Sequence, residues 1–259
     1  MRYTIGIDLH GTLLDEKWQI KPIFEKQLIT ELNSLKKFCK IYICSGNDLT
    51  FIKKHLSSEL RRYFDGYILE TGCVFSDGTT EKIIIPENLI KVIKVIESKL
   101  KLSNIKEIKY FARRLITISL FTKDSNSGID PAIVYPKIKE LIKNLGYDSK
   151  VFVTHSNVAI DIIPKDHNKF TGIQYISNQL KTIGIADSFN DCPMLLNTNC
   201  AFIPANASPK LIDFLKNNKK EIIPIKDVTS YPKNTILKSE NPFTQGVLDS
   251  LKFINNNLK

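Results

Sequence analysis

Short apolar runs alternate with amphipathic stretches in the first part of the chain. The run Tyr3–Asp8 predicts a strand, and Lys40–Cys44 predicts a second buried strand. Between them the apolar positions fall three or four residues apart, which predicts a helix with one apolar face. Those positions are Phe24, Leu28, Leu32 and Leu35. This alternation is typical of parallel sheets with helices on both faces.

The same rhythm extends through the rest of the first 80 residues and returns at Lys169. A helix is expected from about Asp48, with Asn47 or Asp48 as its cap and Phe51, Ile52, Leu56 and Leu60 on its inner side. We expect Gly66–Phe75 to form a strand region that ends in the turn Ser76–Thr79. After Lys169 the expected elements are a helix through Ile173 and Ile176, a strand Thr182–Ile185, a helix around Met194 and a strand Cys200–Ile203. The polar tail Asn255–Asn257 is expected to fray.

The pattern changes between about residues 80 and 162. The expected elements there are a helix Pro86–Leu102, a strand pair within Ile105–Thr122, a helix Pro131–Leu145, and strands Lys150–Thr154 and Val158–Ile162. The sequence therefore predicts an α/β protein. Residues 1–80 and 163–259 would form a doubly wound, Rossmann-like parallel-sheet core, and residues 81–162 an inserted α+β cap.

Composition narrows the class of protein. With 42% hydrophobic and 25% charged residues, the chain of 259 residues is neither disordered nor fibrous. No apolar run approaches the roughly 20 residues of a membrane helix, no signal segment is recognisable, and five cysteines lack a CxxC pair. We expect a cytoplasmic protein without a membrane partner. The net charge of +10 suits anions, but no aromatic-plus-arginine motif indicates nucleic acid as a partner.

Residues with chemical potential follow several of the expected strands. Asp8 ends the first strand, where open α/β sheets bind ligands, and Ser45-Gly46 follows the second with a hydroxyl and turn amides for a phosphate oxygen. The loop Asp187–Asp191 carries two acids and an amide suited to magnesium, and Lys169 can supply a counter-charge. Taken singly, each has a plainer interpretation as a turn residue or a surface lysine.

In this order the residues resemble the haloacid dehalogenase (HAD) superfamily of phosphotransferases. The matching stretches are Asp8–Thr12, Ser45-Gly46, Lys169, Asp187–Asp191, Gly66–Cys73 with Thr71 in place of Asn, and the return segment Val158–Lys169. The return segment resembles that of the subfamily with a large cap, which includes the Cof, sucrose-phosphatase and trehalose-phosphatase types. The resemblance covers nearly the whole chain.

The resemblance implies a mechanism in which Asp8 attacks phosphorus and water releases phosphate from the aspartyl-phosphate. Mg²⁺ would be held by Asp8, the backbone carbonyl of His10 and Asp187, with Asp191 bound through water or outside the first ligands. The phosphoryl group would be held by Ser45, Gly46, Lys169 and Asn190. Among catalytic residues the resemblance implies Asp8, His10 and Lys169.

Two residues depart from the family pattern. Ala186 replaces a glycine, a small change that should leave the loop intact. His10 replaces the aspartate that normally protonates the leaving group and activates water. We expect His10 to serve both steps, since its unperturbed pKa of about 6.5 suits acid-base work near neutrality, with modest activity and a histidine limb in the pH profile.

The leading hypothesis is a phosphatase for a small phosphorylated metabolite, a sugar phosphate by preference, acting as a monomer or homodimer. Two alternatives stay open: a phosphomutase or phosphotransferase, and a catalytically weak member that binds a phosphorylated ligand or a partner protein. The cap would choose the substrate, with the basic group Lys109, Arg113 and Arg114 meeting an anionic part of it.

Overall fold

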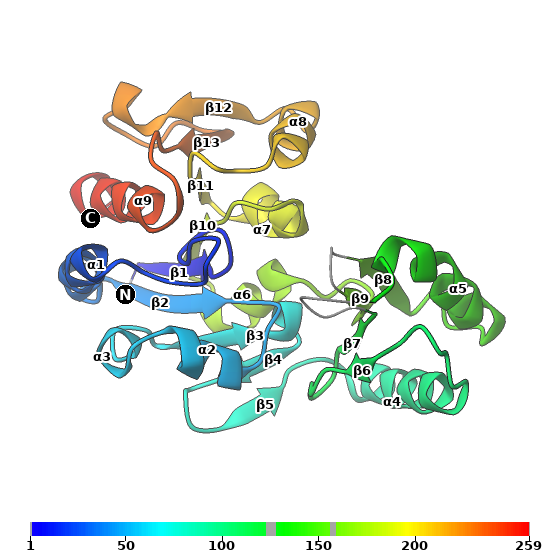
Figure 1. Cartoon of the computed structure of the whole chain (residues 1–259). Coiled ribbons are helices and arrows are strands. Elements are labelled where there is room, and N and C mark those ends of the chain that lie inside the picture. Colours follow the sequence, from blue (N-terminus) through cyan, green and yellow to red (C-terminus); the bar gives the residue numbers. More distant parts are fainter. Residues whose placement is uncertain (1, 123–127, 156–158, 259) are drawn as a thin grey trace. The chain divides into compact units, whose positions relative to one another are not determined.

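A computed structural model describes residues 2–122, 128–155 and 159–258 (Figure 1). The chain divides into two compact units, one made of Met1–Glu81 and Asn168–Lys259 and the other of Lys82–His167. The expected strand Val158–Ile162 begins at a residue outside the described ranges. The first and last residues of the chain also lie outside them. The α/β class and the inserted α+β unit are confirmed.

A nine-stranded sheet organises the first unit. Its order is β12-β13-β11-β10-β1-β2-β3-β4-β5, and all pairs from β12 to β3 are parallel. The strands are β1 Tyr3–Asp8, β2 Cys39–Cys44, β3 Gly66–Leu69, β4 Val74–Ser76, β5 Glu81–Ile83, β10 Lys181–Ile185, β11 Cys200–Ile203, β12 Glu221–Pro224 and β13 Thr235–Lys238. In the central register Asp8 lies opposite Cys44, and Ile7 opposite Ile185. The loops after β1, β2 and β10 therefore leave the sheet at one edge.

Helices connect these strands, and one expected helix is divided. The helices are α1 Pro22–Leu35, α2 Leu49–His55, α3 Ser58–Arg61, α6 Lys169–Ser177, α7 Cys192–Asn197, α8 Pro209–Asn217 and α9 Phe243–Asn257, with 3-10 turns η1 Glu70–Gly72, η2 Phe189–Asp191 and η3 Ile225–Asp227. Asp48 caps α2 as predicted, accepting a bond from the Phe51 amide. The backbone becomes extended at Leu56, which ends α2. Ser57 then caps the next helix, α3. Leu56 and Leu60 are nevertheless buried.

Two further expectations are wrong. Gly66–Phe75 is not one strand region, because the turn η1 separates β3 from β4 and reverses the chain, so that the two strands pair antiparallel. The tail Asn255–Asn257 does not fray, because it forms the last turn of α9. Asn255 is buried, and its Nδ2 donates to Glu31 Oε2 of α1 at 2.6 Å. α1 and α9 lie side by side in Figure 1.

The second unit has an antiparallel sheet in the order β6-β7-β9-β8. Its elements are β6 Tyr110–Phe111, β7 Ile118–Phe121, β8 Val151–His155, β9 Ala159–Pro164, and the helices α4 Glu87–Leu102 and α5 Pro131–Asn144. Apolar residues alternate along the strands, with Leu120, Ile160 and Ile162 fully or almost fully buried. α5 packs against β8 and β9.

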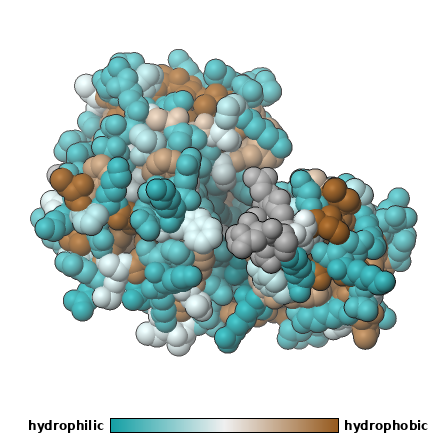
Figure 2. All heavy atoms as spheres, viewed as in Figure 1, coloured by the Kyte–Doolittle hydropathy of each residue, from teal (hydrophilic) through white to brown (hydrophobic). Residues whose placement is uncertain are grey.

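Hydrophilic residues cover most of the face shown in Figure 2, with hydrophobic residues in small groups. Within the described ranges, no helix combines the length and the apolar character needed to cross a bilayer. All five cysteines are free thiols and are buried.

The turn after β3 carries strained backbone. Glu70, Thr71 and Gly72 have φ values of 48°, 58° and 95°. The Thr71 amide donates to Ser45 O at 3.0 Å, so the turn braces the loop after β2. A Cβ on Gly72 would lie 2.0 Å from Asn168 O, just before α6. Only glycine fits there, whereas β-branched Thr71 occupies a left-handed conformation at an energetic cost.

We therefore expect Thr71→Asn to stabilise the protein, because asparagine tolerates the left-handed region better than a β-branched residue. The gain should be roughly 1 kcal/mol, or about 2–4 °C in Tm. Thr50→Asn, in an exposed α-helical position, is the matched control and should change Tm little. Thermal unfolding of the three proteins measures this, and an unchanged or lower Tm in Thr71→Asn would show that the turn is not strained by its side chain.

Candidate active site

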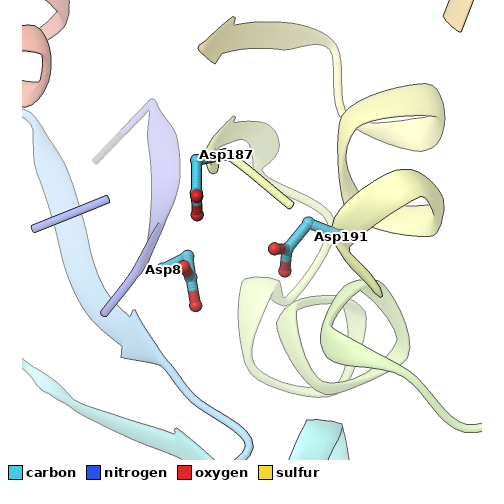
Figure 3. A group of neighbouring side chains, drawn as sticks. All are labelled: Asp8, Asp187 and Asp191. Carbon is cyan, nitrogen blue, oxygen red and sulfur yellow. The ribbon is translucent and has the colours of Figure 1, made fainter. Parts of the chain in front are cut away.

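Three aspartates meet at the carboxyl edge of the central strands. Asp8 ends β1, Asp187 follows β10 by two residues, and Asp191 ends the turn η2. One carboxylate oxygen from each lies within 4.8 Å of the others, close enough to share a cation (Figure 3). Asp8 and Asp191 are buried, and Asp187 is partly buried. Figure 3 shows the three carboxylates converging from separate segments.

Lys169 is the buried cation of this cluster. It is the first residue of α6, and a capping box formed by Asn168 and Thr171 fixes the start of the helix. Its Nζ lies 2.5 Å from Asp8 Oδ1 and 2.5 Å from Asp191 Oδ1. Burial acts to lower the pKa of Lys169, but the two carboxylates outweigh it and raise that pKa, so the ammonium remains charged.

The cluster carries more negative than positive charge. Three carboxyl groups face one ammonium, and burial raises the pKa of Asp8 to about 7, although Lys169 acts to lower it. Burial likewise raises the pKa of Asp187 to about 6. A bound divalent cation would offset this excess, and carboxylate oxygens are the ligands that magnesium prefers. The donor set therefore fits Mg²⁺.

Hydroxyl groups that the sequence analysis did not single out position these carboxylates. Thr12 Oγ1 lies 2.9 Å from Asp8 Oδ2 and 2.9 Å from Asp187 Oδ1. Ser188 Oγ donates to Asp191 Oδ2 at 2.7 Å. Thr12 stands in the stretch that carries the family resemblance, but no periodicity indicates that its hydroxyl lies between aspartates from two strands. These bonds fix the orientation of all three acids.

The loop after β1 is shaped around Asp187. Gly11 has φ 72°, and a Cβ at this position would lie 2.4 Å from Asp187 Oδ2. Asn206 Nδ2 donates to Gly11 O at 2.7 Å, while Asn206 Oδ1 accepts from the Phe243 amide at 2.9 Å. Thr244 Oγ1 donates to Leu13 O at 2.7 Å. The start of α9 therefore holds the loop that follows Asp8.

Ser45 and Gly46 form the loop after β2. Ser45 is buried, its amide donates to Ile68 O at 2.8 Å, and its Oγ accepts from the Asn47 amide at 3.1 Å. Gly46 is exposed, and a Cβ there would lie 3.4 Å from Thr71 Oγ1. The strained turn at Thr71 thus contacts and supports the Ser45-Gly46 loop. The roles of Ser45 and Gly46 with phosphate stay predictions.

His10 packs against rings. Its ring centroid lies 4.8 Å from that of Phe51 and 5.5 Å from that of Trp18, and its Nδ1 lies 3.4 Å from Asn47 Nδ2. Burial lowers the pKa of His10 to about 4, and the positive charges of Lys169 and His55 act in the same direction. The imidazole is therefore neutral near pH 7 in this structure, and the histidine limb expected in the pH profile of turnover stays a prediction.

Four further residues were named from the sequence. Asn190 belongs to η2, but its side chain is exposed rather than turned into the buried cluster. Lys109, Arg113 and Arg114 belong to the second unit: Lys109 directly precedes β6, and the two arginines lie between β6 and β7. Lys109 and Arg113 are exposed, and Arg114 is partly buried. Their contact with a substrate stays a prediction.

Comparison with known proteins extends this description. Residues 132–222 match the family model of the haloacid dehalogenase-like hydrolases. No curated protein sequence gives a significant match. A HAD/COF-like hydrolase from Plasmodium vivax has a similar fold, with a TM-score of 0.66, 16% identity, and coverage of 100% of this chain and 96% of that one.

Two other solved structures share the fold. Protein 0175 of Thermoplasma acidophilum has a TM-score of 0.64 at 15% identity, covering 98% of this chain and 99% of that one. The sucrose-phosphatase of Synechocystis, solved with sucrose and phosphate, has a TM-score of 0.64 at 16% identity, covering 97% and 98%. At such identities these likenesses concern the fold.

The match of residues 132–222 to this family model and the fold shared with the solved structures point in the same direction. The family match supports a phosphatase or phosphoryl-transfer enzyme. The acidic cluster lies at the sheet edge where this α/β arrangement binds its ligands.

Gly11→Ala should weaken cation binding, because the new methyl group would collide with the Asp187 carboxylate. Gly146→Ala is the matched control: its φ is 75°, but nothing lies within 4 Å of the added methyl. Both changes introduce a left-handed alanine, which costs about 1–2 kcal/mol. Only Gly11→Ala should also lower Mg²⁺ affinity, by about tenfold or more, as other changes around metal ligands do. Calorimetric Mg²⁺ titration checks this, and equal affinities in both variants would contradict it.

Proposed function

We propose that the protein is a Mg²⁺-dependent phosphatase that hydrolyses a small phosphorylated metabolite through an aspartyl-phosphate on Asp8. The observation that carries the proposal is the buried group of three aspartates with a single bridging lysine. Such a group is costly in an apo protein and suits phosphoryl transfer, where positioning and charge neutralisation supply most of the catalysis.

Each residue has a defined task in this mechanism. A carboxylate oxygen of Asp8 attacks phosphorus, the substrate oxygen leaves, and water then cleaves the acyl phosphate to regenerate Asp8 and release phosphate. Thr12 and Lys169 hold the two oxygens of Asp8 and so orient the nucleophile. Lys169 also offsets charge on the phosphoryl oxygens, which Ser45 and the Gly46 amide would bind.

The metal would be held by the carboxylates of Asp8, Asp187 and Asp191 together with the backbone carbonyl of His10. When bound, it would neutralise charge on the transferring phosphoryl group. The raised pKa values of Asp8 and Asp187 are consistent with a site built to receive a cation.

A sugar phosphate is the proposed substrate. Similarity of fold to a sucrose-phosphatase solved with sucrose and phosphate supports this choice. The second unit would select the substrate as a cap, with Lys109, Arg113 and Arg114 as candidate contacts. We further propose a cytoplasmic monomer or homodimer.

A second candidate function is a catalytically weak protein that binds a phosphorylated ligand. One observation favours it: the neutral imidazole of His10 cannot donate a proton to a leaving group near pH 7. The two candidates differ in the rate of phosphate release and share the binding site.

Asp8→Asn should abolish phosphate release while the fold survives, because an amide cannot act as the nucleophile and is a weaker Mg²⁺ ligand. The measurement is phosphate release from a set of sugar phosphates with Mg²⁺, alongside circular dichroism of both proteins. Asp213→Asn, at an exposed position of α8, serves as the matched control. Activity retained in a clean Asp8→Asn preparation would exclude the aspartyl-phosphate mechanism.

His10→Asp should raise turnover by about 100-fold or more, because a carboxyl group there can exchange protons with the leaving group and with water. His55→Asp places the same charge in the same ring cluster without adjoining Asp8, and should bring no such gain. His10→Ala should remain as slow as the wild type. A fast wild-type enzyme that His10→Ala slows about 100-fold would instead identify His10 as the working acid-base group.

A further inference from the structure

A tight loop follows the nucleophile segment. Asp15 closes it: its amide donates to Gln19 O at 3.1 Å, and its Oδ1 accepts from the amides of Lys17 and Gln19 at 2.9 and 3.0 Å. The Trp18 amide donates to Asp15 O at 2.9 Å. The loop is thus a built structure with Trp18 near its tip; it lies in the dark blue segment after β1 in Figure 1.

Trp18 occupies an unfavourable position. Its φ is 60°, in the left-handed region that bulky residues rarely adopt. Its side chain is nevertheless 48% exposed, so the strain is not offset by full burial of the indole. Trp18 is the single tryptophan of the chain. Strained backbone that presents an exposed aromatic side chain is characteristic of ligand-contacting positions.

Three rings pack against the indole. Its centroid lies 5.5 Å from that of His10, 5.7 Å from that of Phe51 and 5.5 Å from that of His55. The pairs with Phe51 and His55 are edge-to-face, and His55 Nδ1 lies 3.3 Å from Trp18 O. The indole is therefore fixed in place while about half of its surface remains available.

This ring group adjoins the two loops of the proposed phosphate site. His10 is two residues beyond Asp8, and its Nδ1 lies 3.4 Å from Asn47 Nδ2. The Asn47 amide in turn donates to Ser45 Oγ at 3.1 Å. A phosphoryl group held between Asp8 and Ser45 would therefore place the organic part of its ester within reach of the ring group.

We propose that Trp18 contacts the organic part of the substrate and that its exposed indole face selects phosphates of ring-shaped molecules, such as pyranose sugars. A flat, apolar surface gains most from a ring that covers it, because a flexible acyclic chain buries less area and loses more freedom on binding. This inference rests on the proposed function, and it locates part of the substrate selection in the unit that carries Asp8 rather than in the cap.

Binding can be tested without turnover, because Trp18 is the only source of tryptophan fluorescence. The Asp8→Asn protein with Mg²⁺ would be titrated with glucose 6-phosphate, glycerol 3-phosphate and inorganic phosphate. We expect a change in Trp18 emission with glucose 6-phosphate and a much smaller one with the other two. Equal changes with all three would overturn the inference.

Steady-state kinetics of Trp18 variants test whether this residue selects the substrate. Trp18→Ala should raise KM for glucose 6-phosphate by about tenfold, the scale of one lost apolar contact, and leave KM for glycerol 3-phosphate nearly unchanged. Trp18→Phe should retain most of the affinity. Tyr175→Ala, which removes a ring of similar exposure (51%) from α6, is the matched control and should change neither. Equal effects of Trp18→Ala on both substrates, or none, would show a merely structural role.

The outcomes separate the two proposals. Glucose 6-phosphate that binds in a Trp18-dependent manner without being hydrolysed by the wild type would exclude the phosphatase and keep the Trp18 contact. Hydrolysis that Trp18→Ala leaves unchanged would keep the phosphatase and exclude the contact. If glucose 6-phosphate neither binds nor is hydrolysed, both are wrong.

Discussion

The contact on which the site depends is the double ion pair from Lys169 to Asp8 and Asp191 in the interior. Two charged carboxylates could not be buried side by side without it, since removing one partner of a buried pair leaves an uncompensated charge. The lysine balances only part of the negative charge, and burial raises the pKa values of Asp8 and Asp187 accordingly. The site therefore carries an excess of negative charge that a bound cation would offset.

The parallel sheet makes this arrangement attainable. Because β1 lies between β2 and β10, their following loops leave at one edge, and residues separated by more than 160 positions become neighbours. The loops themselves are held by backbone in the left-handed region at Gly11, Trp18 and Thr71. Strain of this kind persists only where surrounding bonds overdetermine the conformation, and here the start of α9, the Asp15 side chain and the Ser45 loop supply those bonds.

The surroundings of His10 change its protonation behaviour from that of an ordinary histidine. A histidine beside a nucleophile is an obvious acid-base candidate by its ordinary pKa. Packed between Phe51 and Trp18 and exposed to the charge of Lys169, it is instead held neutral. In the proposed enzyme, the ring group would leave the site without a proton donor and would provide an apolar surface beside it.

The sequence by itself determined the α/β class, the inserted α+β unit and most helix and strand positions, because hydrophobic periodicity is a local property that burial of each element enforces. It also indicated the strand ends at which Asp8, Ser45 and Asp187 stand. The division of the helix after Asp48, the reversal at η1 and the ordered end of α9 depended on tertiary contacts such as that of Asn255 with Glu31. The Thr12 bridge, the neutral state of His10, the exposed side chain of Asn190 and the ring contacts of Trp18 were likewise decided by the tertiary structure. Each depends on distances between segments remote in sequence or on the direction of a single side chain. Such distances and directions produce no periodic pattern in the sequence.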